Sequence, residues 1–170
     1  MLAQAIKQIK DKDTPVREFA CLTGSMILLF SAIESYSTSV AFSLPKIDRF
    51  KSFDYDSYRQ KRTFWEKLEL LCDAVPIKVD KSEGLFQQIE KMRLWRNLVT
   101  HSSPYEIEPT KIENTVNETR KLHYPQRHKN YPQVTNLGNA KLYYNAAYDF
   151  IMIIKDKTGI EPRAKATYKV

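Results

Sequence analysis

The chain has 170 residues, a length that suits one hydrophobic core and is too short for two full-sized domains. Hydrophobic residues make up 42% and charged residues 28%, with only 4 Gly against 8 Pro, a globular composition that argues against a turn-rich β architecture. Lys and Arg number 27 against 20 Asp and Glu, so the net charge of +7 favours acidic partners such as nucleic acid.

The two cysteines, Cys21 and Cys72, lie within apolar helical patterns and have no close-spaced metal-binding partners. We interpret both as reduced core residues, with a disulfide as the alternative. No basic leader followed by an apolar run opens the chain, and the run Met26 to Phe30 is far shorter than the roughly 20 residues that span a bilayer. We therefore expect no membrane segment and a cytoplasmic protein.

The first long helix is predicted over about residues 15–44. Asp13-Thr14-Pro15 supplies a capping side chain and a proline for the first turn, and Leu44-Pro45 marks the end. Apolar residues then recur at steps of three and four, which places them on one face of a helix. These residues are Phe19, Leu22, Met26, Leu29, Ile33, Tyr36 and Val40.

A second helix is predicted over about residues 58–74, before Pro76 interrupts the pattern. Its apolar face consists of Phe64, Leu68, Leu71 and Val75. The preceding residues 46–57 mix charges with aromatic side chains without a regular period. We interpret them as a connection that packs a few aromatic residues.

A third helix is predicted over about residues 81–102. Asp80 and Glu83 have capping-box spacing at its start. Pro104 disfavours helical geometry at Ser103, so we expect His101 in the last turn. The apolar face of this helix consists of Leu85, Ile89, Met92 and Val99, and it also contains Arg96.

A long polar insertion follows over residues 105–135, and a last helix is predicted over about residues 136–158 with Gly159 as its stop. The expected face of that helix is Leu137, Ala140, Tyr144, Ala147, Ile151 and Ile154. Four such helices predict an all-α fold: a four-helix up-and-down bundle with short accessory helices and the insertion before the last helix. Residues 1–170 would form this single domain.

Arg96 is unusual because it shares a helix face with apolar residues. A charged side chain seldom enters a core unless it is paired, so Arg96 should reach an edge, a cleft or an interface where an anion meets it. His101 lies five residues later, roughly 140° around an unbroken helix. The two side chains would converge only if the terminal turn bends.

The segment Met92-Arg93-Leu94-Trp95-Arg96-Asn97-Leu98-Val99-Thr100-His101 resembles the defining motif of HEPN domains: Arg, a polar residue directly after it, a short spacer and His near a helix end. The resemblance implies an all-helical homodimer in which two third-helix motifs face each other and form one metal-independent, cofactor-free RNA-cleaving cleft. Many members are toxins or phage-defence ribonucleases, so an antitoxin protein is a further expected partner. Ser103 stands where toxins paired with a nucleotidyltransferase have Tyr, so we do not carry over their regulation.

The resemblance implies an endoribonuclease that cleaves RNA by 2′-hydroxyl attack and leaves a cyclic phosphate. His101 would be the acid–base group, because imidazole titrates near neutrality. Arg96 would stabilise charge on the phosphorane, and Asn97 would orient the phosphate or the imidazole. Family members often add an acidic residue on an earlier helix, for which Glu34 is the candidate; a solvated or ion-paired Glu34 is the favoured alternative.

Further RNA-binding candidates are Arg93 and a segment that interleaves basic with aromatic side chains, as a loop that grips phosphates and stacks on bases would. This segment contributes Arg120, Lys121, Tyr124, Arg127, Lys129 and Tyr131. A plain solvated loop is the alternative. His123 and His128 lack nearby cysteines or well-spaced carboxylates, so we expect no metal site.

Two other functions stay open for the motif. Arg96 would make a helix-end salt bridge and His101 a C-terminal cap in a catalytically inactive family member. Such a non-catalytic dimer would bind RNA, a nucleotide or a protein partner. A purely structural helical oligomerisation domain would do neither.

Overall fold

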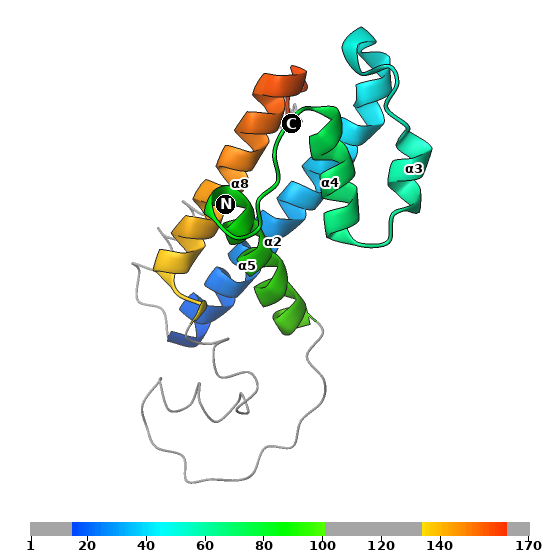
Figure 1. Ribbon diagram of the computed structural model, residues 1–170. Coiled ribbons are helices and arrows are strands. Elements are labelled where there is room, and N and C mark those ends of the chain that lie inside the picture. The colour runs from blue at the N-terminus through cyan, green and yellow to red at the C-terminus, as the bar shows by residue number, and fades with distance from the viewer. Residues whose placement is uncertain (1–14, 101–133, 163–170) are drawn as a thin grey trace, which may run out of the picture. The chain divides into compact units, whose positions relative to one another are not determined.

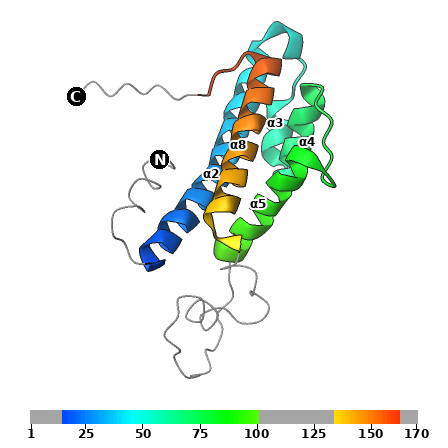
Figure 2. The ribbon, with the colours of Figure 1, turned by 90° about the vertical axis from the view of Figure 1, so that its left-hand side faces the viewer.

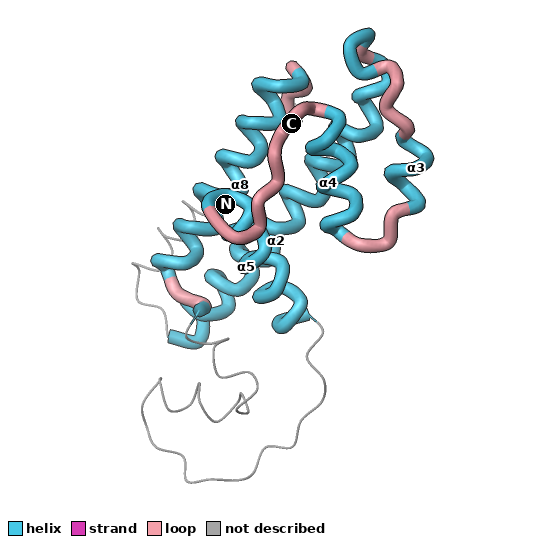
Figure 3. Tube along the Cα trace, in the orientation of Figure 1, coloured by secondary structure: helices cyan, strands magenta, loops and turns pink. Residues whose placement is uncertain are grey.

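The computed structural model describes residues 15–100 and 134–162, and every regular element in these two stretches is helical (Figure 3). The predicted all-α class is therefore confirmed for this part of the chain. His101 and nearly all of the predicted insertion lie outside the described residues, as do the six RNA-binding candidates between Arg120 and Tyr131.

Within the described residues, three helices are long and four are short (Figure 1). The long helices are α2 (Pro15–Ser43), α5 (Gly84–Thr100) and α8 (Leu137–Thr158), and the short ones are η1 (Leu44–Lys46), η2 (Asp48–Phe50), α3 (Tyr55–Gln60) and α4 (Phe64–Ala74). The chain groups into two compact units. The first is Met1–Phe30 with Gln88–Asn145, and the second is Ser31–Gln87 with Ala146–Val170, so each long helix contributes to both.

Helices α2 and α8 are uninterrupted and match the predicted ranges within a residue (Figure 2). In α2 most of the predicted face is buried, because steps of three and four keep side chains on one side of a helix. In α8 the predicted face is wrong in part. Tyr144 is exposed while its neighbour Tyr143 is buried, and Leu137 is also exposed.

By length and composition alone, the helix Glu18–Lys46 could cross a membrane, contrary to the expectation that no such segment exists. The core helix of a soluble protein and a signal sequence pass the same test, so it assigns no location. Met26, Phe30 and Ile33 of this helix are fully buried inside the protein.

The predicted second helix, residues 58–74, is wrong in its extent, because two helices stand there. Helix α3 ends at Gln60, because the backbone of Lys61 is extended. Helix α4 begins at Phe64, after its N-cap Thr63. Thr63 and Glu66 form a capping box: the Thr63 Oγ1 accepts a hydrogen bond from the Glu66 amide, and the Glu66 carboxylate accepts one from the Thr63 amide at 2.8 Å. The capping box therefore starts a new helix inside a segment that the spacing of apolar residues predicts as one continuous helix.

We expect Thr63→Ala to destabilise the protein by about 1 kcal/mol, because it removes the side-chain acceptor at the start of α4. Urea unfolding at pH 7 measures this loss. Ser52→Ala, at an exposed turn residue, is the control and should leave the unfolding midpoint unchanged. An equal midpoint for Thr63→Ala and the wild type would contradict the role of the cap.

The same cap makes stability depend on pH. Hydrogen bonds from Thr63 and then from the Arg62 amide lower the pKa of Glu66 below its ordinary value. A carboxyl group with a lower pKa in the folded state adds stability above its unfolded pKa, and this contribution is lost as the pH falls through the folded pKa. The difference in the free energy of unfolding between the wild type and Thr63→Ala should therefore become smaller well below pH 4. Urea unfolding at several pH values measures it.

Helix α5 begins at Gly84, a few residues later than predicted, and the expected capping box of Asp80 with Glu83 does not form. The Asp80 carboxylate instead accepts hydrogen bonds from the amide and hydroxyl of Ser82, which shapes a turn. Gly84 has φ +59°, a left-handed conformation that glycine adopts without steric cost. A glycine at this position therefore sets where the helix starts.

The two cysteines are free: Cys72 is buried and Cys21 is half-buried. Burial raises the pKa of the Cys72 thiol to about 12. Both thiols are reduced as expected, although only Cys72 is a full core residue.

Candidate functional site

The Arg-Asn motif lies on the last turns of α5, in the first unit. Leu85 and Val99 of the predicted apolar face are only half-buried. The buried side of this helix includes Ile89 and Met92, as predicted, and Trp95, which lies outside the predicted face. Because these three side chains are anchored, the orientation of the residues between and beyond them is set.

Trp95 fixes the helix next to the motif. Its Nε1 donates a hydrogen bond to the Thr135 Oγ1 at 3.3 Å, and its ring meets the Tyr143 ring edge-on at 6.1 Å between centroids. The Tyr143 hydroxyl donates to the Lys91 carbonyl at 3.3 Å, and burial raises the pKa of Tyr143 to about 12, so this hydroxyl stays protonated. Two side chains beyond the helix thus hold α5 in register.

Arg96 is half-buried and lies over an aromatic ring, as its place on the apolar face requires. The guanidinium carbon is 5.3 Å from the centroid of Phe30, a cation–π distance, and Phe30 itself is 1% exposed. The Arg96 Nη1 donates to the Asn97 Oδ1 at 3.0 Å, and the Thr100 hydroxyl donates to the Arg96 carbonyl at 2.9 Å. The guanidinium therefore has a fixed platform and a fixed polar neighbour.

Arg93, the other cation of the motif segment, is already paired on its own helix. Its Nε and Nη2 donate to the two carboxylate oxygens of Glu90 at 2.7 and 2.8 Å. This fork-to-fork pair raises the pKa of Arg93. Arg93 is thus less available to a phosphate than its position in the sequence indicates.

An exposed apolar side chain stands beside the motif. Leu94 is 54% exposed, and it lies three residues before Asn97, so both share one side of α5. A single exposed apolar side chain is common on protein surfaces, and its place beside Arg96 and Asn97 makes this side of α5 a candidate contact surface.

Glu34 belongs to the second unit, where it lines a small polar pocket with Ser37 and Tyr58. Glu34 also makes an interaction of its own, so it is not a free carboxylate. Within residues 15–100 and 134–162, no three His, Cys, Asp or Glu side chains gather as a metal site would require.

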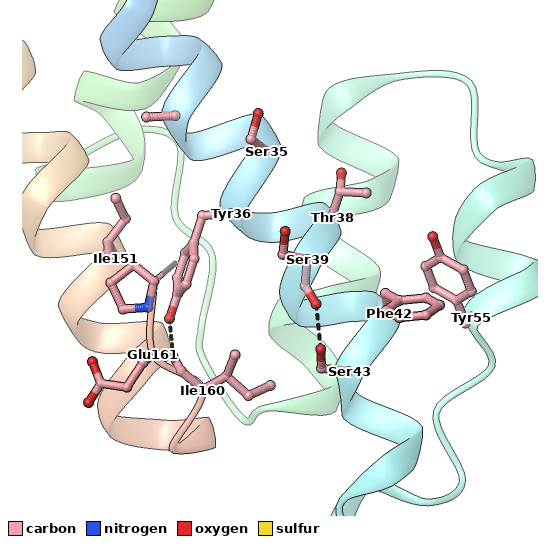
Figure 4. A pocket seen from close by; sticks show the side chains of 12 residues that line it. Ser35, Tyr36, Thr38, Ser39, Phe42, Ser43, Tyr55, Ile151, Ile160 and Glu161 are labelled. Carbon is pink, nitrogen blue, oxygen red and sulfur yellow. Dashed lines mark hydrogen bonds between the residues drawn. The ribbon is translucent and has the colours of Figure 1, made fainter. Parts of the chain in front are cut away.

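A larger pocket of about 480 Å³ also belongs to the second unit (Figure 4). Tyr36 points into it and donates a hydrogen bond to the Ile160 carbonyl at 2.7 Å, and burial, followed by the charges of Glu161 and Asp156, raises the pKa of Tyr36 to about 12. The lining is otherwise Ser, Thr, Tyr55 and apolar side chains, with Glu161 as its one charged residue. A pocket without a cation does not suit a phosphate.

The comparisons with known proteins give no relative. No family model matches this chain, and neither a curated protein nor a solved structure matches it. Its function is therefore argued from its own side chains.

Sequence reasoning missed the residues that support the motif. Phe30 fell outside the predicted face of the first helix, since that pattern passes through Met26 and Leu29. Trp95 and Thr135 carry no sequence signal as a pair, because forty residues separate them. The sequence feature that points to such a partner is Arg96 itself, because an arginine on an apolar helix face needs an aromatic or anionic group nearby.

Proposed function

We propose that this protein is a HEPN-type, metal-independent endoribonuclease. The observation that carries the proposal is the half-buried Arg96, held over Phe30 and hydrogen-bonded to Asn97 on the helix that leads directly to His101. A guanidinium fixed in this way can receive developing negative charge without rearranging, which is how positioned donors accelerate phosphoryl chemistry.

The reaction proceeds by attack of a ribose 2′-oxygen on the adjacent phosphorus. The O2′–P bond forms and the P–O5′ bond breaks, so the products are a 2′,3′-cyclic phosphate and a free 5′-hydroxyl. His101 takes the 2′-hydroxyl proton or gives one to the leaving oxygen, and Arg96 stabilises the phosphorane. Asn97 orients Arg96, and the family resemblance implies Glu34 as a supporting acid.

The assembly that completes this site is a homodimer through α5. Exposed Leu94 beside Asn97 supports it, because pairing two such surfaces would bury the leucines and bring two copies of the motif together. Each protomer would be a single four-helix up-and-down bundle. We place the protein in the cytoplasm, as a toxin or phage-defence nuclease that acts on RNA and is restrained by an antitoxin protein.

Purified protein and its histidine variants test the proposal. The chain has 3 histidines, so His123→Ala and His128→Ala are matched controls for His101→Ala. We expect His101→Ala to lower the cleavage rate by ~10²–10⁴ while both controls cleave normally. Chelator should have no effect, and mass spectrometry should find cyclic phosphate ends.

An RNA whose 2′-hydroxyls are replaced by hydrogen should resist cleavage, because the nucleophile is gone. Cleavage of that substrate, or equal rates for His101→Ala and the wild type, would overturn the mechanism. Expression of the wild type and His101→Ala in cells, with growth and total RNA integrity compared, extends the test to the toxin role.

A non-catalytic HEPN-like dimer that binds RNA, a nucleotide or a protein is the second candidate. It is favoured by the internal partners of both arginines, since Arg93 is held by Glu90 and Arg96 by Asn97. Salt-dependent RNA binding without cleavage, with and without divalent ions, would select this function.

A further inference from the structure

A small polar pocket in the second unit lies among α2, α3 and α4. Its volume is about 150 Å³, and its polar lining consists of Glu34, Ser37, Thr38, Tyr58, Arg62, Thr63 and Lys67. At ~30 Å³ per water molecule this space equals about five waters. One phosphate group fits in this volume.

Ser37 gives the pocket an unsatisfied donor. The residue is 3% exposed, and its Oγ has no hydrogen-bond partner among the residues that the structure describes. Buried hydroxyls are almost always paired, because leaving one unpaired is unfavourable. A buried serine that lines a pocket in this state is suited to donate to a group inside it.

Two cations, Arg62 and Lys67, line the same pocket. Neither Arg62 nor Lys67 forms an ion pair within the described part of the chain, whereas Lys81 pairs with Glu69 at 2.6 Å. Lys67 is half-buried, and its Nζ is 5.8 Å from the ring centroid of Tyr58. Against these two positive charges Glu34 is the one carboxylate of the lining, so the net charge of the walls is positive.

Further hydroxyls complete the lining. The Thr38 hydroxyl donates to the Glu34 carbonyl at 2.9 Å, so the Tyr58 hydroxyl, 3.4 Å from the Thr38 Oγ1, is the donor of that pair. Burial raises the pKa of Tyr58. The nearby Glu66 carboxylate is taken up by the capping box of α4 and does not line the pocket. Ser37 is therefore the unpaired hydroxyl offered to a ligand, beside two cations and the Glu34 carboxylate.

We propose that this pocket binds a single phosphate group, with Ser37 as the hydroxyl donor and Lys67 and Arg62 as charge partners. Charge-assisted hydrogen bonds to oxyanions are about twice as strong as neutral ones, and each oxygen of a phosphate accepts several. The ligand is either inorganic phosphate or the 5′-phosphate at a nucleic-acid end. The site shares only Glu34 with the proposed nuclease and does not depend on it.

Thermal unfolding and titration calorimetry with sodium phosphate test the proposal, against sodium chloride at equal ionic strength. Phosphate should raise the Tm of the wild type and of Lys141→Met, a control at an exposed lysine of α8. Lys67→Met should weaken phosphate binding by about 10- to 100-fold, and Lys67→Arg should retain most of it. A DNA oligonucleotide with a 5′-phosphate is then compared with its 5′-hydroxyl form. Binding of the phosphorylated form alone would identify a nucleic-acid end as a source of the phosphate.

Ser37→Ala separates ligand binding from a structural role. We expect this variant to bind phosphate several-fold more weakly while its Tm without phosphate stays equal or rises, because an unpaired buried hydroxyl is removed. The proposal is wrong if phosphate does not stabilise the wild type. It is also wrong if Ser37→Ala and Lys67→Met respond to phosphate as the wild type does.

Discussion

Arg96→Met should lower the rate of RNA cleavage by ~10²–10³, the usual loss when one positioned donor to a developing oxyanion is removed. Methionine keeps an apolar, unbranched side chain over the ring of Phe30, so the packing changes little while the charge and the hydrogen bond to Asn97 are lost. Single-turnover cleavage measures the effect, and circular dichroism verifies the helix content.

Arg93→Met is the matched control, because it removes an arginine from the same helix. The Arg93 guanidinium is already occupied by both oxygens of Glu90, so this change should cost less than about tenfold in rate. Arg96→Lys keeps a positive charge but lacks the planar guanidinium, so its cleavage rate should lie between those of the wild type and Arg96→Met. Equal losses for Arg93→Met and Arg96→Met would mean that general positive charge, and no fixed guanidinium, supports activity.

Phe30→Ala should destabilise the protein by about 3–5 kcal/mol, because it empties the space of a fully buried ring. Since a domain is commonly stable by about 5–15 kcal/mol, this one change can leave much of the protein unfolded at 37 °C. The shift of the urea midpoint measures the loss.

Phe30→Leu then separates packing from support of Arg96. It keeps most of the apolar volume, so we expect a loss of less than about 1.5 kcal/mol in stability. It removes the aromatic face, however, so cleavage should fall by more than the loss of folded protein explains. Phe150→Leu is the control, because Phe150 is equally buried on α8 and the described residues place no cation over it. If both leucine variants cleave equally well, Phe30 contributes packing alone.

The long helices could be predicted from the sequence because their apolar spacing extends over many turns. Helices α2 and α8 match their predicted ranges, and Pro15 and Gly159 stand where a start and a stop were expected. The break between α3 and α4 was missed although Thr63 and Glu66 show the spacing of a capping box. Apolar residues on both sides of the break continue the same period, so spacing alone joins two helices.

Side-chain partners were harder to predict than helices. The sequence identified Arg96 as a cation on an apolar face, yet its platform Phe30 lies on another helix, and no periodicity pairs residues across helices. The same reason applies to Tyr143. The buried face of α8 differs from the predicted one by one residue, so Tyr143 packs against Trp95 and Tyr144 is exposed. Such choices depend on the fit of side chains between elements.

The indole of Trp95 has a practical consequence. The chain contains 2 tryptophans, and Trp95 is buried directly beside Arg96 while Trp65 lies on α4 in the second unit. With Trp65 replaced by Phe, the tryptophan fluorescence of the protein would come from one position in the motif. Changes in its emission would then show whether an oligonucleotide reaches α5, before any bond is broken.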